Sequence, residues 1–454
     1  MPLRIELTLT AHRSFCQDSH TTMGIGLIWN IGYMAAARVL GLAAQGLATV
    51  VLARYLTAAD YGVIGYATVF LAFLNLFQDA GLQGAAVQAS EFSERARATA
   101  FWMKLTLSAT LAICGMIAAP LTLVAFDDPG AASVIRALSL CYLLTSVAFV
   151  PSILLLRDLN YRAISLVQAL SALAGSSCSI VMAMIGSGYW SIVVGSIVWN
   201  LVLMLASMRL RPYWPRLEFD RGVARGFWGY GLGLSSANLV VFALFNADNL
   251  LIGAILGATQ LGYYALAFNW GSLVASTLCG VVGGVLFPTF SRLNRDEMRR
   301  IYIRSVRYSL AAGMLANVTL AVAAPSLLIS VLGRGTDKWL PALGPLYVLC
   351  LYGVLRVTLE PLGSVVVAVG KPGAMLRPNV IVAVIQIAAL YPALRLGGIT
   401  AAAVVVLVSY ALQYPLYSRF LREELNVRWA DVFQLKGWTS DFPSLRGLLA
   451  ARRR

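Results

Sequence analysis

Charged residues are scarce in this chain. Only 12% of its 454 residues are Asp, Glu, Lys or Arg, whereas 59% are hydrophobic. A soluble domain of ordinary composition carries about 25% charged residues, and a core surrounded by water could not bury so large an apolar fraction. The scarcity of charge therefore excludes a soluble globular protein and predicts an all-α polytopic membrane protein.

Residues that support metal, redox or hydrolytic chemistry are also scarce. The two histidines, His12 and His20, lie in the polar N-terminal stretch, and the six cysteines show no CxxC spacing. We interpret the cysteines as packing residues and expect no metal ion and no disulfide framework. No GxxxxGK[ST] motif occurs, which argues against transport driven by the protein's own ATP hydrolysis. Because the longest internal polar loop, residues 209–225, is too short for a catalytic domain, we expect a transporter without a cofactor and not an enzyme.

Twelve apolar stretches are each long enough to cross a hydrocarbon core, which takes about 20 helical residues. We predict spans at 25–53, 61–88, 98–125, 132–155, 162–186, 188–208, 226–255, 260–288, 302–332, 340–369, 374–396 and 398–420. The predicted parts of the chain are a polar tail (1–24), a six-helix bundle (25–208), a linker (209–225), a second six-helix bundle (226–422) and a basic amphipathic tail (423–454). The composition of the last part fits either a segment lying on an anionic membrane surface or a solvated tail.

A short motif occurs twice, 200 residues apart. LTAADYGVIGYA (Leu56–Ala67) and LGATQLGYYALA (Leu256–Ala267) share Leu, Ala, Gly and Ala at equivalent positions. The tripeptide AAP at Ala118–Pro120 also recurs at Ala323–Pro325. We interpret these echoes as two homologous halves. The aromatic residues near the two motifs are interpreted as an aromatic belt at the membrane interface: Tyr61, Tyr66, Tyr263, Tyr264 and Trp270.

The net charge of +15 is distributed as membrane topology requires. Of the 35 Lys and Arg residues, 27 lie in or beside the two tails and the loops that follow even-numbered spans, five lie in or beside the other loops, and three lie deeper within spans. Cations placed between apolar segments argue against a nucleic-acid partner. By the positive-inside rule the distribution predicts that both termini are cytoplasmic.

Two arginines lie near the middle of predicted spans, one in each half. Arg38 shares a helical face with Gln45 in the first span, and Arg356 lies in the tenth. A charged group at this depth costs about 2.5–3.5 kcal/mol on insertion scales, so it tends to face an aqueous or protein interior. Two such cations suit an anionic headgroup such as a diphosphate. The alternative for Arg356 is an intrahelical pair with Glu360, one turn further on.

Carboxylates and amides also occur within the spans. Asp79 lies in the second span and Asp248 in the seventh. Amides and rings share one face of the seventh span and are suited to bind the hydroxyls and CH faces of sugars: Asn238, Phe242, Phe245 and Asn249. Two alternatives are helix–helix hydrogen bonding by Asn and Asp, and a proton or sodium site at Asp79 or Asp248 that couples transport to an ion gradient.

Three segments resemble a known family. LARYLTAADYGVIGYATVFLAFLNLFQDAGLQGAAVQ, NADNLLIGAILGATQLGYYALAFNW and VLFPTFSRL are similar to the Wzx-type polysaccharide flippases of the multidrug/oligosaccharidyl-lipid/polysaccharide exporter superfamily. The resemblance covers residues 25–420. It implies two pseudo-symmetric six-helix bundles in a V around a central cavity. Among site residues it carries over only Asp79, Asn246 and Asp248, which match family motifs.

The resemblance also implies a substrate and partners. Such flippases move an undecaprenyl-diphosphate-linked oligosaccharide repeat unit across the bacterial inner membrane by alternating access, for assembly into surface polysaccharide. A polysaccharide polymerase and chain-length or export proteins are the implied protein partners, and membrane lipids surround the helices. The rivals are a drug or cation antiporter of the same superfamily, a lipid II flippase, which typically has two further C-terminal spans, and a non-transporting scaffold for assembly enzymes. Mid-membrane arginines disfavour the antiporter because they repel cationic drugs.

Overall fold

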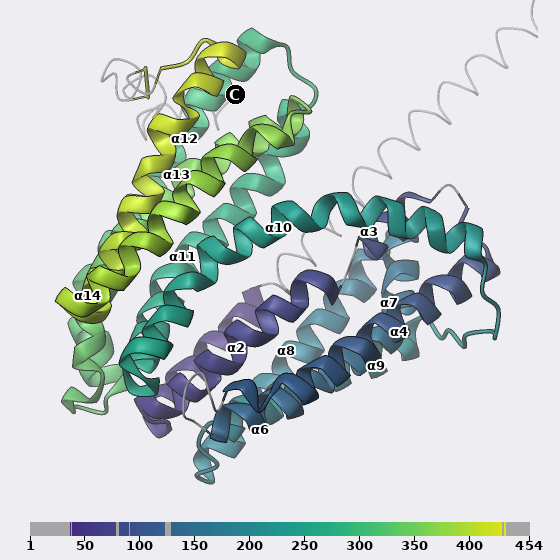
Figure 1. The fold of residues 1–454 in the computed structure, drawn as a ribbon, viewed down its shortest axis with the longest axis horizontal. Helices are drawn as coiled ribbons and strands as arrows, with labels where there is room; N and C mark the ends of the chain where they lie inside the picture. Colours follow the sequence, from purple (N-terminus) through teal and green to yellow (C-terminus); the bar gives the residue numbers. More distant parts are fainter. Residues whose placement is uncertain are drawn as a thin grey trace, which may run out of the picture. The chain divides into compact units, whose positions relative to one another are not determined.

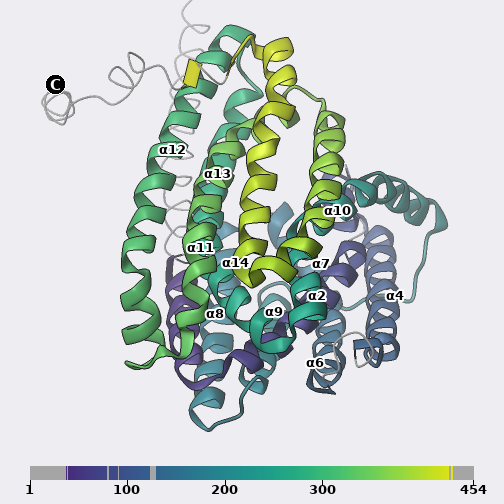
Figure 2. The same cartoon turned by 60° about the vertical axis from the view of Figure 1, so that its left-hand side comes forward.

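The computed structural model describes residues 37, 39–78, 81–89, 91–122, 129–428 and 431–432, without the side chains at 88, 228–238 and 372. Arg38 and Asp79 lie outside the described residues, as does the side chain of Asn238. Every regular element of the described residues is a helix (Figures 1 and 2). The fold is therefore all-α, as predicted.

The helices follow the predicted apolar stretches. Their bounds are α2 (Ala58–Gln78), α3 (Leu82–Gln88), α4 (Glu94–Ala118), α6 (Pro129–Ser139), α7 (Cys141–Arg157), α8 (Tyr161–Met184), α9 (Trp190–Leu210), α10 (Arg221–Leu256), α11 (Ala258–Phe290), α12 (Arg295–Ser326), η1 (Leu327–Leu332), η2 (Asp337–Ala342), α13 (Leu343–Ala368), η3 (Pro372–Met375) and α14 (Leu376–Leu425).

Ten stretches of the described residues are long and apolar enough to span a membrane, and a shorter apolar helix covers Val39–Tyr55. The longest stretch, Gly373–Leu425, contains two predicted spans, because Gly397 and Gly398 have non-helical backbone angles inside α14. Gly398 has φ 60°, a conformation that glycine adopts without steric penalty. With the break counted and the short helix included, the twelve predicted spans all have a helical counterpart, and the chain is a multi-pass membrane protein.

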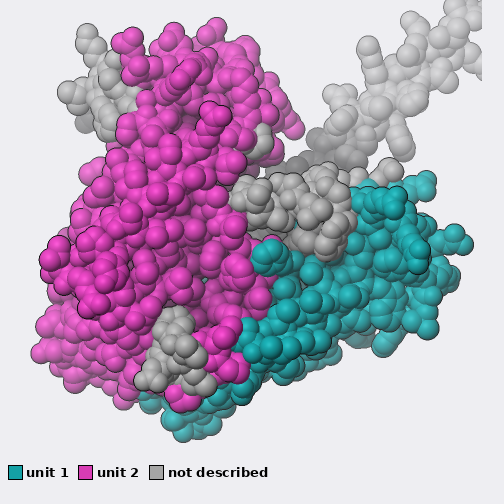
Figure 3. Space-filling model, in the orientation of Figure 1, with its two compact units in different colours: residues 1–55, 77–119, 133–234 teal, residues 56–76, 120–132, 235–454 magenta. Residues whose placement is uncertain are grey.

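Two compact units make up the chain (Figure 3). Unit 1 comprises residues 1–55, 77–119 and 133–234, and unit 2 comprises residues 56–76, 120–132 and 235–454. Most of α2 therefore packs with the C-terminal half of the chain. The boundary within α10 falls between Leu234 and Ser235.

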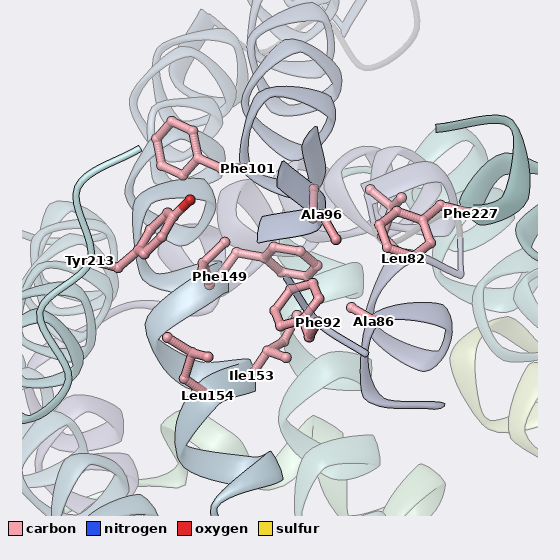
Figure 4. Packing of buried hydrophobic residues seen from close by; sticks show 12 residues of the cluster. Leu82, Ala86, Phe92, Ala96, Phe101, Phe149, Ile153, Leu154, Tyr213 and Phe227 are labelled. Atoms are coloured by element: carbon pink, nitrogen blue, oxygen red, sulfur yellow. The ribbon is translucent and has the colours of Figure 1, made fainter. Parts of the chain in front are cut away.

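An aromatic cluster holds one end of unit 1 together (Figure 4). Phe92, just before α4, packs with Phe149 and Ile153 of α7, and the cluster includes Tyr213 from the linker. Burial raises the pKa of the Tyr213 phenol. The Trp102 indole N–H also donates to the linker carbonyl of Arg216 at 2.8 Å. The linker is thus packed against α4 and α7 along part of its length.

In unit 2, helix α13 packs against α11, α12 and α14 (Figures 1 and 2). A capping box begins α12, in which the Asn294 side chain accepts from the backbone N–H of Glu297 at 2.9 Å and the Glu297 carboxylate accepts from that of Asn294 at 3.4 Å. Arg307, also in α12, is buried and donates to the carbonyls of Asp431 and Val432 at 2.8 and 2.9 Å. The start of the C-terminal tail is therefore tied to α12.

The two copies of the repeated motif contact one another within unit 2. A Cβ atom at Gly62 would overlap the carbonyl group of Ala258, and a Cβ atom at Gly262 would overlap that of Ala58. The contact is reciprocal: Gly62 of the first copy faces Ala258 of the second, and Gly262 of the second copy faces Ala58 of the first. Backbones can approach this closely only where the residue has no side chain.

The aromatic residues near these motifs are mostly buried in the protein. Tyr66 and Tyr264 are 1% and 0% exposed, and the Tyr66 hydroxyl donates to the Gly253 carbonyl at 3.2 Å. Tyr61 packs edge-on against the fully buried Trp339, with ring centroids 5.5 Å apart. The prediction of an aromatic belt is therefore wrong for these three tyrosines, whose rings are core residues of unit 2. A position near the end of a span could not distinguish the membrane interface from the protein core, since both environments favour large amphipathic rings.

Candidate functional site

The buried carboxylate of Asp248 joins two helices of unit 2. Asp248 of α10 is 1% exposed, and its Oδ2 accepts from the hydroxyl of Tyr264 in α11 at 2.6 Å. Its Oδ1 accepts from the backbone N–H of Asn249 at 2.8 Å. Both carboxylate oxygens therefore have a partner, as a buried acidic group requires. In this structure the side chain holds α11 against α10, in the manner of the helix–helix alternative.

A continuous line of aromatic rings leads away from that carboxylate. The Tyr264 ring stacks on Phe268, which in turn lies 6.0 Å from the ring of Tyr352 in α13. Tyr352 meets Tyr410 of α14 edge-on, with centroids 4.6 Å apart. Because Tyr264, Tyr352 and Tyr410 are all buried, this aromatic line forms part of the core where α11, α13 and α14 meet.

Arg356 lies at the far end of the aromatic line. Its guanidinium carbon is 5.1 Å from the centre of the Phe245 ring of α10, and that ring is 6.4 Å from Tyr410. Arg356 is half-buried. A cation held over an aromatic face is stabilised by about 0.5–2 kcal/mol, depending on its desolvation. The ring at the end of the aromatic line thus stabilises the guanidinium of the mid-span arginine inside an apolar segment.

Glu360 forms no ion pair with Arg356 in this structure. None of the ion pairs among the described residues joins their side chains. The half-buried Glu360 carboxylate instead lies beside Gly283 of α11, where any side chain would collide with it. Arg356 therefore keeps a positive charge without a carboxylate partner among the residues that the structure describes.

The predicted amides have different surroundings. The Asn246 side chain donates to the Phe242 carbonyl of its own helix at 3.0 Å, and Asn249 is half-buried one position after Asp248. Residue 238 lies in α10. Gln45 belongs to unit 1, where it is exposed to a cavity between the helix Val39–Tyr55 and α8. The structure thus brings Asp248, Asn249, Arg356 and Glu360 into one unit and places Gln45 in the other.

Sequence reasoning missed the residues that connect Asp248 to Arg356. Tyr352 and Tyr410 come from α13 and α14, and each lies in an apolar run where a tyrosine reads as an ordinary core residue. The available signal was spacing, because Tyr352 precedes Arg356 by one helical turn. Tyr410 carries no such signal. Its place beside Tyr352 depends on how α14 packs against α13.

Removing the Tyr264 hydroxyl is expected to weaken unit 2. Tyr264→Phe leaves one oxygen of the buried Asp248 carboxylate without its partner, so the free energy of unfolding should fall by about 1–2 kcal/mol. The measurement is denaturant unfolding of the purified protein in detergent. Tyr347→Phe is the matched control, since Tyr347 is 41% exposed on α13. Equal effects of the two changes would contradict a structural role for the Asp248–Tyr264 bond.

Chemically, this part of unit 2 combines a supported cation with an aromatic wall. It offers one positive charge, the half-buried ring of Phe245 and the half-buried amide of Asn249, whereas the three tyrosine rings are buried. These groups are suited to hold a ligand.

The sequence and the fold both match known proteins. A family model described as "Polysaccharide biosynthesis protein" matches residues 51–343. The lipopolysaccharide biosynthesis protein WzxC of Escherichia coli strain K12 is 24% identical over 371 residues, which are 80% of this chain and 73% of that protein.

Two solved structures show the same fold. The lipid II flippase MurJ in an inward closed conformation has a TM-score of 0.69 at 14% identity, covering 92% of this chain and 94% of that chain. An inward-facing multidrug resistance MATE transporter of the MOP superfamily has a TM-score of 0.67 at 14% identity, covering 85% and 95%. These neighbours are transporters and flippases.

Proposed function

Because the chain belongs to the polysaccharide biosynthesis protein family, we propose that it is a flippase for a lipid-linked oligosaccharide. In this proposal the substrate is a polyprenyl diphosphate that carries a repeat unit of a surface polysaccharide. The protein moves its headgroup from the cytoplasmic to the outer side of the bacterial inner membrane. The observation that carries the proposal is Arg356, a half-buried cation within an apolar span that has no carboxylate partner among the described residues.

The charge of the diphosphate explains why such a cation is needed. An anion that crosses a hydrocarbon core loses its hydration, and the loss is prohibitive unless a counter-charge replaces the water. A guanidinium matches phosphate oxygens with paired N–H donors. Arg356 fills this role in our proposal, with Arg38 as the second cation. The polyprenyl chain needs no site of this kind, because it can remain in the lipid.

The other predicted residues have supporting roles in the proposal. Asn238, Asn246 and Asn249 offer amides to sugar hydroxyls along α10, and Asp248 sets the position of α11 against that helix. Asp79 remains a candidate for ion coupling.

Movement between the two sides is proposed to follow alternating access, with residues 25–208 and 226–422 acting as the two halves. Both termini are placed in the cytoplasm by the distribution of Lys and Arg. A polysaccharide polymerase and chain-length or export proteins would receive the substrate on the outer side.

Reconstitution of the purified protein tests the proposal directly. Vesicles containing the protein and a fluorescent polyprenyl-diphosphate-linked oligosaccharide should lose most of their protected, inner-leaflet fluorescence to an added irreversible and membrane-impermeant quencher, whereas vesicles without the protein should keep it. The same vesicles are loaded with a cationic dye. Movement of the dye without movement of the glycolipid would indicate a drug antiporter. A parallel assay with lipid II tests the second rival, since movement of lipid II alone would identify a lipid II flippase. If no probe moves, the result favours a scaffold.

A further inference from the structure

A cavity lies in unit 1, whereas the aromatic line and Arg356 belong to unit 2. Its volume is about 360 Å³, and it lies between the helix Val39–Tyr55, α8 and α9. Small-molecule sites in proteins have volumes of about 300–1,000 Å³. The cavity is therefore large enough for a small ligand or for one part of a larger one.

Two small residues bring the helices together beside this cavity. A Cβ atom at Gly41 would lie 3.5 Å from that of Ala172 in α8, so the two helices meet closely at this level. Gln45 lies one turn after Gly41, and Gln168 lies one turn before Ala172. Both amides line the cavity beside this contact.

The polar groups that line the cavity have no protein partner. Within the described residues, the side chains of Gln45, Ser165, Gln168 and Trp199 neither donate nor accept a hydrogen bond. Unpaired amide, hydroxyl and indole groups in an apolar span are costly, because hydrocarbon offers them no partner. Ser165 is buried, Trp199 is half-buried, and Gln45 and Gln168 are exposed, so their partners in the cavity are water or a ligand.

The chemistry of the lining selects the class of ligand. The two amides and the hydroxyl can both donate and accept, and the indole of Trp199 adds a donor and a flat apolar face. No charged side chain occurs among the described lining residues. Such a surface suits the hydroxyls and CH faces of a sugar.

Resting on the proposed function, we infer that this unit 1 cavity is a subsite for an uncharged sugar of the lipid-linked oligosaccharide. Gln45, Ser165 and Gln168 bind its hydroxyls, and the Trp199 ring packs against its CH face. These residues set the preference for the repeat unit, whereas Arg356 in unit 2 responds to the diphosphate that all such substrates share.

Binding of two probes tests the inference. The first is the polyprenyl-diphosphate-linked oligosaccharide fraction extracted from cells that make the polysaccharide, quantified by its phosphate. The second is undecaprenyl diphosphate without sugar. Loss of one or two neutral hydrogen bonds corresponds to a factor of about five to thirty in affinity. Gln168→Leu in the purified full-length protein should weaken binding of the first probe by that factor and leave binding of the second unchanged.

Two further variants show that the effect is local. Trp199→Ala should weaken binding of the sugar-bearing probe to a similar degree. Trp199→Phe, which keeps a flat ring, should weaken it less. Gln83→Leu repeats the amide-to-leucine change at an exposed position of α3, outside the cavity, and should leave both affinities at the wild-type value. Thermal unfolding of each variant checks that the fold is retained.

Each other outcome has a defined meaning. If Gln168→Leu and Trp199→Ala leave the sugar-bearing probe unaffected, the cavity holds only water and the inference is wrong, although the proposed function stands. An equal loss of affinity for both probes also overturns the inference, because these residues would then not recognise the sugar. A wild-type protein that binds neither probe overturns the proposed function itself.

Discussion

Replacing Arg356 with alanine is expected to reduce glycolipid translocation at least ten-fold. The guanidinium is the described mid-span cation over Phe245, and it forms no ion pair with a carboxylate among the described residues. A hydrogen bond to a charged group contributes about 1.5–3 kcal/mol, and each 1.4 kcal/mol corresponds to a factor of about ten. The measurement is the initial rate of translocation in vesicles, with surface polysaccharide in cells as the second readout.

Two controls separate the charge of Arg356 from its geometry. Arg356→Lys keeps the charge but loses the paired N–H donors and the planar group that lies over Phe245, so part of the rate should be lost. Arg377→Ala removes an arginine from an exposed position near the start of α14 and should leave the rate within about two-fold of the wild type. A wild-type rate for Arg356→Ala at normal protein abundance would remove this residue from the mechanism.

The spans were predictable because hydrocarbon imposes one requirement on every one of them. Each must be apolar for about 20 residues and must satisfy its backbone within a helix, so composition and length located all twelve. The break at Gly397–Gly398 fell between the predicted spans 374–396 and 398–420 for the same reason. The repeated motif also indicated a relation between Leu56–Ala67 and Leu256–Ala267.

The partners of the polar residues were not predictable in the same way. The sequence singled out Asp248 and Arg356 because charge is rare within spans, but it gave no sign that Tyr264 holds the carboxylate or that Phe245 lies under the guanidinium. Those contacts depend on the packing of helices far apart in the chain. Gln168 and Trp199 were missed since one amide or one indole in an apolar span is common, and their significance comes from sharing a cavity with Gln45.

The contact between the two copies of the repeated motif leads to the second large expected effect. Gly62→Val should lower the free energy of unfolding by about 3 kcal/mol or more, at the upper end of what overpacking typically costs. The new side chain would meet the backbone carbonyl of Ala258, and a backbone group cannot turn aside as a flexible side chain can. Gly262→Val should have an effect of similar size, because Ala58 faces that glycine in the same way.

A glycine elsewhere on α11 makes this test specific. A Cβ atom at Gly284 would meet nothing within 4 Å, so Gly284→Val changes only the helix propensity and should alter stability by no more than about 0.5 kcal/mol, in the favourable direction. Opposite signs for valine at Gly62 and at Gly284, measured by denaturant unfolding in detergent, would therefore reflect the contact and not the residue type. If all three variants unfold alike, α2 and α11 do not pack through these glycines, and the 200-residue repeat has no counterpart in the way the motifs meet.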